Sequence, residues 1–562
     1  MLALALAFAA LVAAPQLVAA PQSMGSIHFS VTGSARCQRS FTEGMLALHS
    51  FMYDRAHAIF QAAAKGEPAC AMARWGDAMA YSHPIWSEEN VPAAKAALAA
   101  VIGEEKLTPK ERAFLSTARS LWGDGDAAAR RQAWFAAAER MHRDFPADDE
   151  VSLEYALALI AASDRLTNLN LLMKSAAISM DVLQRNPNHP GAAHYLIHAC
   201  DSPDHAILAL PAARRYAQIA PAASHALHMP SHIFVQLGMY ADVAASNEAS
   251  WAASQVERKA LGKGPDQRDW HSYSWLVDAY LNLGKLNRAS SMMRALREML
   301  VKDDGPETRF GYALVLDDWL NATGRWSEAK ELLAPLAKPL PLEKGEASDS
   351  LGCAMHAPGG AEARPPWGLV AGVMQAEIRA QAAMMAGEEQ EVASAFEPVA
   401  ALHAAMAPWG KVGLYKLLQE RSEKLLPAFS AGARARRSQS AADWTAAVEA
   451  FQKLAAVPDL MLNGPAFFPP SQQLLGDVLF AAGRPKDALA AYQRTLAQHP
   501  LLARSLLGAA RAARAAGDGK TARDRYAALA TLWGQPDADA PAVEEVREYE
   551  KIFAAEERPA DR

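Results

Sequence analysis

Cysteine is scarce in this chain: among 562 residues there are four, Cys37, Cys70, Cys200 and Cys353. No two of them form a C-x-x-C pair, which argues against a zinc ribbon or a thioredoxin-type redox site. The sequence also lacks the H-E-x-x-H, G-x-S-x-G, Walker and dinucleotide-binding motifs. Because these catalytic signatures are missing, the sequence favours a binding protein over an enzyme.

A strong excess of one charge is missing too. The 56 basic and 62 acidic residues leave a net charge of −6, which gives no global field for attracting nucleic acid or an anionic membrane. Beyond the N-terminus, no uncharged run is long enough to cross a bilayer. We therefore expect that the chain does not bind nucleic acid and that, beyond the N-terminus, it has no stable membrane-spanning helix.

The N-terminus itself is apolar from Leu2 to Ala14 and is followed by small residues of the A-x-A type. The run is too short to span a bilayer as a helix, and the pattern predicts a signal peptide over residues 1–20. The protein is then periplasmic or secreted. No Lys or Arg precedes the run and Pro21 follows the expected cleavage point, so an upstream start or uncleaved anchoring are the alternatives.

The chain is rich in alanine, a strong helix former, and it has a sequence period of 34 residues. The period is clearest where Gly483, Ala488 and Tyr492 are followed 34 positions later by Gly517, Ala522 and Tyr526. Matching elements upstream are Gly44, Ala56, Phe60, Ala63, Gly238, Gly284, Gly324 and Gly387.

This spacing resembles the tetratricopeptide repeat (TPR), whose unit is a pair of antiparallel helices. The resemblance covers most of residues 37–535. It implies an all-α solenoid in which stacked hairpins form a right-handed superhelix and bind a protein or peptide in a concave groove. The chain also resembles secreted bacterial TPR proteins that have a Cys-Ala-Met-Ala-x-Trp-Gly segment, here starting at Cys70, and a central His-rich double repeat.

Interruptions of the 34-residue period divide the chain into segments. We expect an N-terminal TPR array over 37–334, a Pro/Gly-rich loop over 335–366, a C-terminal array over 367–535 and an acidic tail over 536–562. In the first unit, Cys37 opens one helix and Cys70 follows the helix that returns beside it. The ends of such a hairpin meet, so the pair forms either a disulfide or two buried thiols.

Seven of the sixteen histidines fall between His189 and His232. When Pro187 and Pro221 each end a repeat, His194 and His198 take positions 5 and 9 of one unit. His228 and His232 take the same positions of the next. In TPR proteins these positions face the groove, so the resemblance implies four imidazoles that converge on one metal ion across two neighbouring helices. Pro230 lies between the second pair and predicts either a kink or a helix that begins there.

Further candidates follow from the same register. His225 and His271 take position 2 of consecutive units, and Asp201 and Asp278 are the carboxylates expected in an outer shell. Imidazoles without thiolates suit Zn or Cu and are poor ligands for Ca²⁺ or Mg²⁺.

The sequence thus predicts a TPR binding protein with a His-lined pocket for a transition metal or for a polar ligand or peptide. The alternatives are a metal-dependent hydrolase or oxidase in the same pocket, and a plain interaction scaffold with structural histidines.

Overall fold

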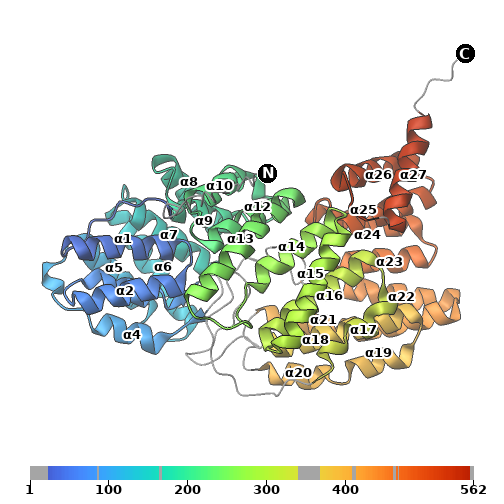
Figure 1. The fold of residues 1–562 in the computed structure, drawn as a ribbon, viewed down its shortest axis with the longest axis horizontal. Coiled ribbons are helices and arrows are strands. Elements are labelled where there is room, and N and C mark those ends of the chain that lie inside the picture. The colour runs from blue at the N-terminus through green and yellow to red at the C-terminus, as the bar shows by residue number, and fades with distance from the viewer. Residues whose placement is uncertain are drawn as a thin grey trace, which may run out of the picture.

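The chain folds into antiparallel helical hairpins stacked in one continuous array, as the computed structural model shows (Figure 1). The structure describes residues 23–84, 88–163, 168–338, 367–407, 413–459, 464–465, 468–538 and 540–556. The predicted signal peptide, residues 339–366 of the predicted loop, and Cys353 lie outside these ranges. Among the described residues the fold is all-α apart from one short pair of strands, which confirms the predicted fold class.

The helices of the first half lead up to and include the histidine-rich region. They are Ala35–His49 (α1), Tyr53–Gly66 (α2), Ala71–Met79 (α3), Val91–Ala99 (α4), Pro109–Leu121 (α5), Ala127–Asp144 (α6), Asp149–Ala162 (α7), Leu169–Arg185 (α8), Pro190–Ala199 (α9), Ala206–Ile219 (α10), Ser224–His228 (α11), Pro230–Gln236 (α12), Tyr240–Ala260 (α13) and Trp270–Asn282 (α14). The strands Ser82–His83 (β1) and Glu88–Glu89 (β2) pair antiparallel, with Ser82 opposite Glu89.

The helices of the second half continue the array to the C-terminus. They are Leu286–Lys302 (α15), Pro306–Thr323 (α16), Ala329–Leu332 (α17), Trp367–Ala386 (α18), Glu389–Phe396 (α19), Val399–Ala405 (α20), Gly413–Ser438 (α21), Ala441–Leu454 (α22), Ser471–Ala481 (α23), Pro485–Gln498 (α24), Ala503–Ala515 (α25), Gly519–Trp533 (α26) and Pro541–Glu556 (α27). Short 3₁₀ turns cover Glu104–Lys106, Trp326–Glu328 and Ala334–Leu336.

Glycine ends the first helix of many hairpins because the chain must reverse in a left-handed backbone conformation. The 34-residue period predicts six turn glycines, which are Gly238, Gly284, Gly324, Gly387, Gly483 and Gly517. Their φ angles lie between +67° and +81°. A side chain is strained at such angles, whereas glycine adopts them freely. The sequence therefore placed these turns correctly.

Aromatic residues on the second helix of a hairpin hold consecutive units together. The ring of Tyr492 lies where a Cβ on Gly476 or Gly508 would stand, 2.7 and 2.5 Å from its nearest ring atoms. Phe60 fits between Gly44 and Gly76 in the same manner, with distances of 2.5 and 2.4 Å. Each ring thus packs against its own unit and the next one, which buries a continuous core along the array.

A disulfide joins Cys37 of α1 to Cys70, the residue that precedes α3, with their Cα atoms 5.8 Å apart. It closes the first hairpin, so of the two alternatives predicted from the sequence, a disulfide or two buried thiols, the disulfide is the one observed. Cys200 is a buried free thiol.

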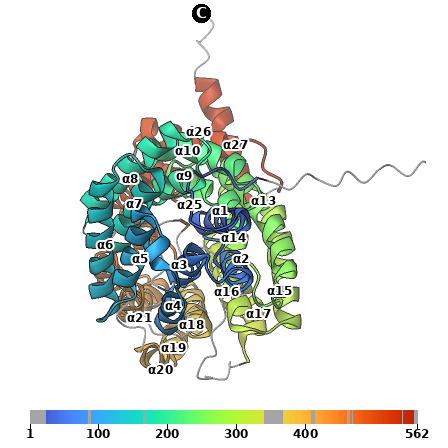
Figure 2. The same cartoon turned by 90° about the vertical axis from the view of Figure 1, so that its left-hand side faces the viewer.

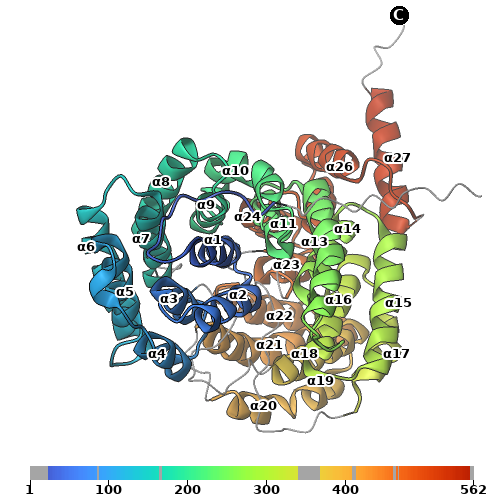
Figure 3. The same cartoon turned by 60° about the vertical axis from the view of Figure 1, so that its left-hand side comes forward.

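The array curls until distant repeats touch. Figures 2 and 3 show the helices following a closed curve with α1 inside it. Helix α1 contacts α9, and α25 contacts both α14 and α16. At one of these contacts the backbone N–H of Ala503 donates to Oδ1 of Asn282, 3.0 Å away. The interior of the superhelix is consequently enclosed by protein on most sides.

Two charged segments of the second half are helical. The basic run around Arg434 belongs to the long helix α21, in which Ala433 and Ala435 are buried while Arg434 is exposed. In the acidic tail, α27 packs on α26 through the rings of Tyr526 and Tyr549, whose centroids lie 4.5 Å apart. No helix in the described part of the chain is both long and apolar enough to cross a membrane.

Candidate metal centre

Six histidine side chains come together where α9, α11, α12 and α14 pack. They are His194 and His198 of α9, His225 and His228 of α11, His232 of α12 and His271 of α14, and we call them the six-histidine cluster. All six are buried, with exposed fractions from 0% for His194 to 9% for His271. The cluster thus lies in the interior rather than on an open groove wall.

Proline positions both helices that carry histidine pairs. Pro190 is the first residue of α9, where its missing N–H costs nothing, and His189 caps that helix. Pro230 begins α12, and Met229 before it keeps helical angles of −52° and −34°. Of the two alternatives predicted from Pro230, a helix that begins there is therefore the one observed, and His228 ends the preceding helix α11. His228 and His232 remain within one turn of each other.

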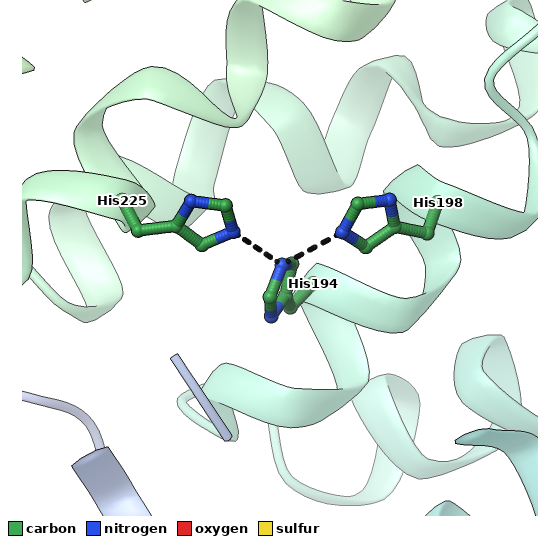
Figure 4. Close-up of side chains that lie close together, drawn as sticks. All are labelled: His194, His198 and His225. Carbon is green, nitrogen blue, oxygen red and sulfur yellow. Dashed lines mark hydrogen bonds between the residues drawn. The ribbon is translucent and has the colours of Figure 1, made fainter. Parts of the chain in front are cut away.

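The first triad consists of His194, His198 and His225. Nε2 of His194 lies 3.0 Å from Nε2 of His198 and 3.0 Å from Nε2 of His225 (Figure 4). One nitrogen atom from each ring lies within 4.8 Å of the other two. His194 is the central member, because it contacts both of the others.

The second triad consists of His228, His232 and His271 and repeats this geometry. Nε2 of His228 lies 3.1 Å from Nε2 of His232 and 3.0 Å from Nε2 of His271. Again one nitrogen from each ring lies within 4.8 Å of the other two. His228 is the central member here.

The single four-histidine site expected from sequence is therefore wrong in its grouping. The structure divides His194 and His198 from His228 and His232, and completes each pair with a histidine at position 2 of the following unit. His228 and His232 lie 34 residues after His194 and His198. His271 lies 34 residues plus an insertion of about a dozen residues after His225. The duplicated feature is thus a whole triad, built across the boundary between two repeats.

Outer hydrogen bonds fix which nitrogen of each central ring carries the proton. Nδ1 of His194 lies 2.7 Å from the backbone oxygen of His49, which can only accept, so Nδ1 donates and Nε2 holds a lone pair. Nδ1 of His228 lies 2.7 Å from Oδ1 of Asn247, whose amide nitrogen donates to Val243. Nε2 of His228 therefore also holds a lone pair.

His232 shows the same arrangement with a charged partner. Its Nδ1 lies 2.8 Å from Oδ2 of Asp201, and Oδ1 of Asp201 accepts from the amide of Gln236. Nδ1 of His232 thus donates, and its Nε2 lies 3.1 Å from Nε2 of His228, which holds a lone pair. A cation between these two nitrogens can be bound by both.

Burial keeps the central rings neutral. Desolvation lowers the pKa of His194 to about 3. Desolvation also lowers the pKa values of His225, His228 and His271 well below the ordinary range, and neighbouring imidazoles add to the effect. At neutral pH these nitrogens are therefore available as metal ligands without losing a proton.

Of the two carboxylates predicted for the outer shell, Asp201 lies there and bonds to His232. Asp278 lies farther along α14, where Nδ2 of Asn282 donates to it at 3.0 Å, and burial raises its pKa to about 7. Asp201 therefore completes a carboxylate–histidine pair of the kind that orients metal ligands. The structure places Asp278 elsewhere, on a cavity wall.

One aromatic ring covers each triad. The ring of Phe51 contacts all three rings of the first triad, with centroid distances of 4.2 Å to His194 and 5.7 Å to His198 and to His225. Trp275 covers the second triad at 4.9, 4.7 and 5.1 Å from His228, His232 and His271. Phe51 has a φ of +53°, which is strained for a non-glycine residue. Sequence analysis singled out neither ring as part of this site.

A third histidine cluster was also missed. His49 and His189 both bond to the buried carboxylate of Glu150, at 2.9 and 3.0 Å, and Nδ1 of His49 meets the hydroxyl of Tyr195 at 3.0 Å. Although burial opposes it, these two imidazoles hold the pKa of Glu150 well below its ordinary value. Here every short contact pairs a donor with an acceptor, so the cluster is satisfied as a hydrogen-bond network without a metal.

A cavity of about 560 Å³, in the size range of small-ligand sites, occupies the superhelix beside the second triad. Its wall includes the residue six places before each of five turn glycines, namely Asp278, Asp318, Gln381, Asp477 and Arg511. Gln236, which donates to Asp201, also lines it. The cavity therefore reaches the outer shell of the six-histidine cluster.

Fold and site together define a class: an all-α solenoid of TPR-type hairpins that encloses two triads of imidazoles. Among solved structures, the chain is similar to a human IFIT1 dimer with PPP-AAAA (11% identity, 89% of this chain and 96% of that chain, TM-score 0.32). It is also similar to yeast Tom70 (10% identity, 93% and 97%, TM-score 0.30). A third is the Pyrococcus horikoshii signal transduction ATPase with a tetratricopeptide repeat sensor (13% identity, 89% and 74%, TM-score 0.26). No family model matches the chain, and neither does any curated protein.

Proposed function

We propose that this TPR-type protein binds transition-metal ions in the six-histidine cluster, with one ion in each triad. The observation that carries the proposal is the pair of triads, in each of which a central Nε2 with a lone pair lies about 3 Å from two further imidazole nitrogens. A metal ion between these nitrogens can be coordinated by all three rings, and the hydrogen bonds of Nδ1 in His194, His228 and His232 hold those rings in the required orientation.

The donor set narrows the choice of metal. Three imidazoles and no coordinating carboxylate suit copper and zinc and disfavour Ca²⁺ and Mg²⁺. Burial of all six rings makes added charge costly, and Asp201 is the carboxylate that bonds to the cluster. Copper(I) adds one positive charge per ion and zinc adds two, so we expect copper(I) to be preferred over zinc.

The other functions predicted from sequence receive less support. A peptide has little access to imidazoles that are at most 9% exposed. A hydrolase needs a general base beside the metal-bound water, but Asp201 is engaged by His232 and Gln236, and Asp278 bonds to Asn282. A protein or peptide partner inside the superhelix remains a separate proposal, which the cavity supports because Asp278, Asp477 and Arg511 lie on its wall.

We also propose a periplasmic or secreted location. The Cys37–Cys70 disulfide supports it, because structural disulfides persist in oxidising compartments.

Elemental analysis of protein purified without a histidine tag tests the metal proposal. After loading with copper(I) or zinc under anaerobic conditions and removal of excess metal, we expect two ions per chain and retention of copper when both metals compete. Less than one ion per chain after either loading would contradict the proposal.

An Asp201→Asn variant tests the outer shell of the second triad. The new side-chain amide can still accept from His232 through its oxygen but removes the negative charge, so we expect the second triad to lose roughly 10–100-fold in affinity. The first triad should be unaffected. A competitive chelator titration should therefore show one weakened step and one unchanged step, and two equally weakened steps would refute the assignment.

A further inference from the structure

Resting on the metal sites proposed above, we propose that the two triads form one binuclear centre whose ions share a small bridging anion. The proposal concerns the relation between the triads and the class of ligand that the metal-loaded cluster takes. It is carried by the spacing of the rings, their backbone connection, and the balance of charge.

The ring distances across the gap between the triads fall within the range of ring distances inside them, which runs from 4.6 to 6.4 Å. Ring centroids of His198 and His232 lie 6.0 Å apart, and those of His225 and His228 lie 6.3 Å apart, across the boundary. Within the first triad, His198 and His225 are 6.4 Å apart. Within the second, His232 and His271 are 6.2 Å apart. The six rings therefore form one contiguous set, and ions in the two triads are close neighbours.

One helical turn connects the two halves. His225 and His228 are three residues apart in α11, and each points into a different triad. The N–H of Met229 donates to the backbone oxygen of His225 at 2.9 Å, which keeps this turn closed. The two triads are thus joined through the backbone of one helical turn.

Divalent ions in both triads favour an anion beside them. Asp201 supplies a carboxylate that bonds to a ring of the cluster. Two copper(II) ions bring four positive charges into the interior, where uncompensated charge is costly. Because three nitrogens leave a position open on each ion, an anion between the ions can fill both positions and offset part of this charge.

The packing limits that anion to a few atoms. Phe51 and Trp275 lie against the rings, and the neighbouring cavity is lined by Gln236 but by none of the six histidines. An anion that reaches ions in these buried triads is therefore a small one, such as hydroxide or azide, rather than a ligand of the size of the cavity.

Electron paramagnetic resonance of the tag-free full chain loaded with copper(II) tests this inference. We expect the integrated spin to be well below the copper content, because a shared anion couples neighbouring copper(II) ions. Added azide should give a new ligand-to-metal absorption band. The matched variants are His271→Ala, which leaves one complete triad and should give spin equal to its copper content, and His142→Ala on α6, which should behave as the parent.

The outcomes separate the two proposals. Two copper ions per chain with full spin intensity, with and without azide, would overturn the binuclear centre and leave the metal sites standing. Failure to retain copper would overturn both. Because the decisive measurement uses the unsubstituted protein, it does not depend on whether a variant folds.

Discussion

A His194→Ala/His228→Ala double variant should lose stoichiometric metal at both triads. His194 and His228 are the central members, each with Nε2 about 3 Å from Nε2 of both other rings in its triad. Loss of a direct ligand should exceed the roughly 10–100-fold cost of losing an outer hydrogen-bond partner. After dialysis against a weak chelator, elemental analysis should find two ions in the parent protein and almost none in the variant.

The control for this experiment must separate lost ligands from lost structure. His142→Ala removes a half-buried histidine outside the cluster, and circular dichroism before and after loading reports whether the helices persist. The single variants His194→Ala and His228→Ala should each retain about one ion, because the triads have no ligand in common. A folded double variant that still holds two ions would refute the site.

Replacing both cysteines of the disulfide should lower the free energy of unfolding more than any other substitution proposed for this protein. A Cys37→Ala/Cys70→Ala variant reopens a loop of 33 residues, for which chain entropy predicts a cost of about 4 kcal/mol. Both cysteines are almost fully buried, so alanine is the substitution that adds no polar group to the core. Urea unfolding followed by circular dichroism should show the transition shifted to lower urea concentration.

This loss should be separable from metal binding. Helix α1 supplies the backbone oxygen of His49 that holds His194, yet His49 lies at the far end of α1 from Cys37. Below its unfolding transition the variant should therefore still bind two ions. A change in unfolding free energy below about 1 kcal/mol would contradict the expected role of the loop.

Much of the architecture could be predicted because it follows from local rules. A glycine is needed wherever the chain reverses with positive φ, and a ring that inserts beside glycine fixes the distance to the next helix. These requirements repeat with each unit, so they appear as a period of 34 residues. The same period gave the positions of all six histidines of the cluster.

The grouping of those histidines could not be predicted from the period. Positions 5 and 9 share one face of a helix, but whether position 2 joins the preceding or the following pair depends on how helices cross. In the structure, His225 completes the pair of the unit before it. A new helix begins at Pro230, and the helical backbone angles of Met229 keep His228 and His232 within one turn of each other.

Partners from distant parts of the chain were equally out of reach. The backbone oxygen of His49 meets His194 across 145 residues, and Phe51, from the turn after α1, covers the first triad. Sequence register says nothing about such contacts because they depend on the curl that brings α1 against α9. The same curl buries the cluster that a more open superhelix would expose on its groove.

The sequence by itself determined the helical hairpins, their turns and the identity of the six imidazoles, because these depend on neighbours within one or two repeats. Only the tertiary structure decided that the imidazoles form two triads, with the backbone oxygen of His49 bonded to Nδ1 of His194 and with Asn247 and Asp201 bonded to Nδ1 of His228 and His232. The physical reason is that coordination depends on the direction of individual nitrogen atoms. Packing between helices sets that direction, and no spacing along the chain records it.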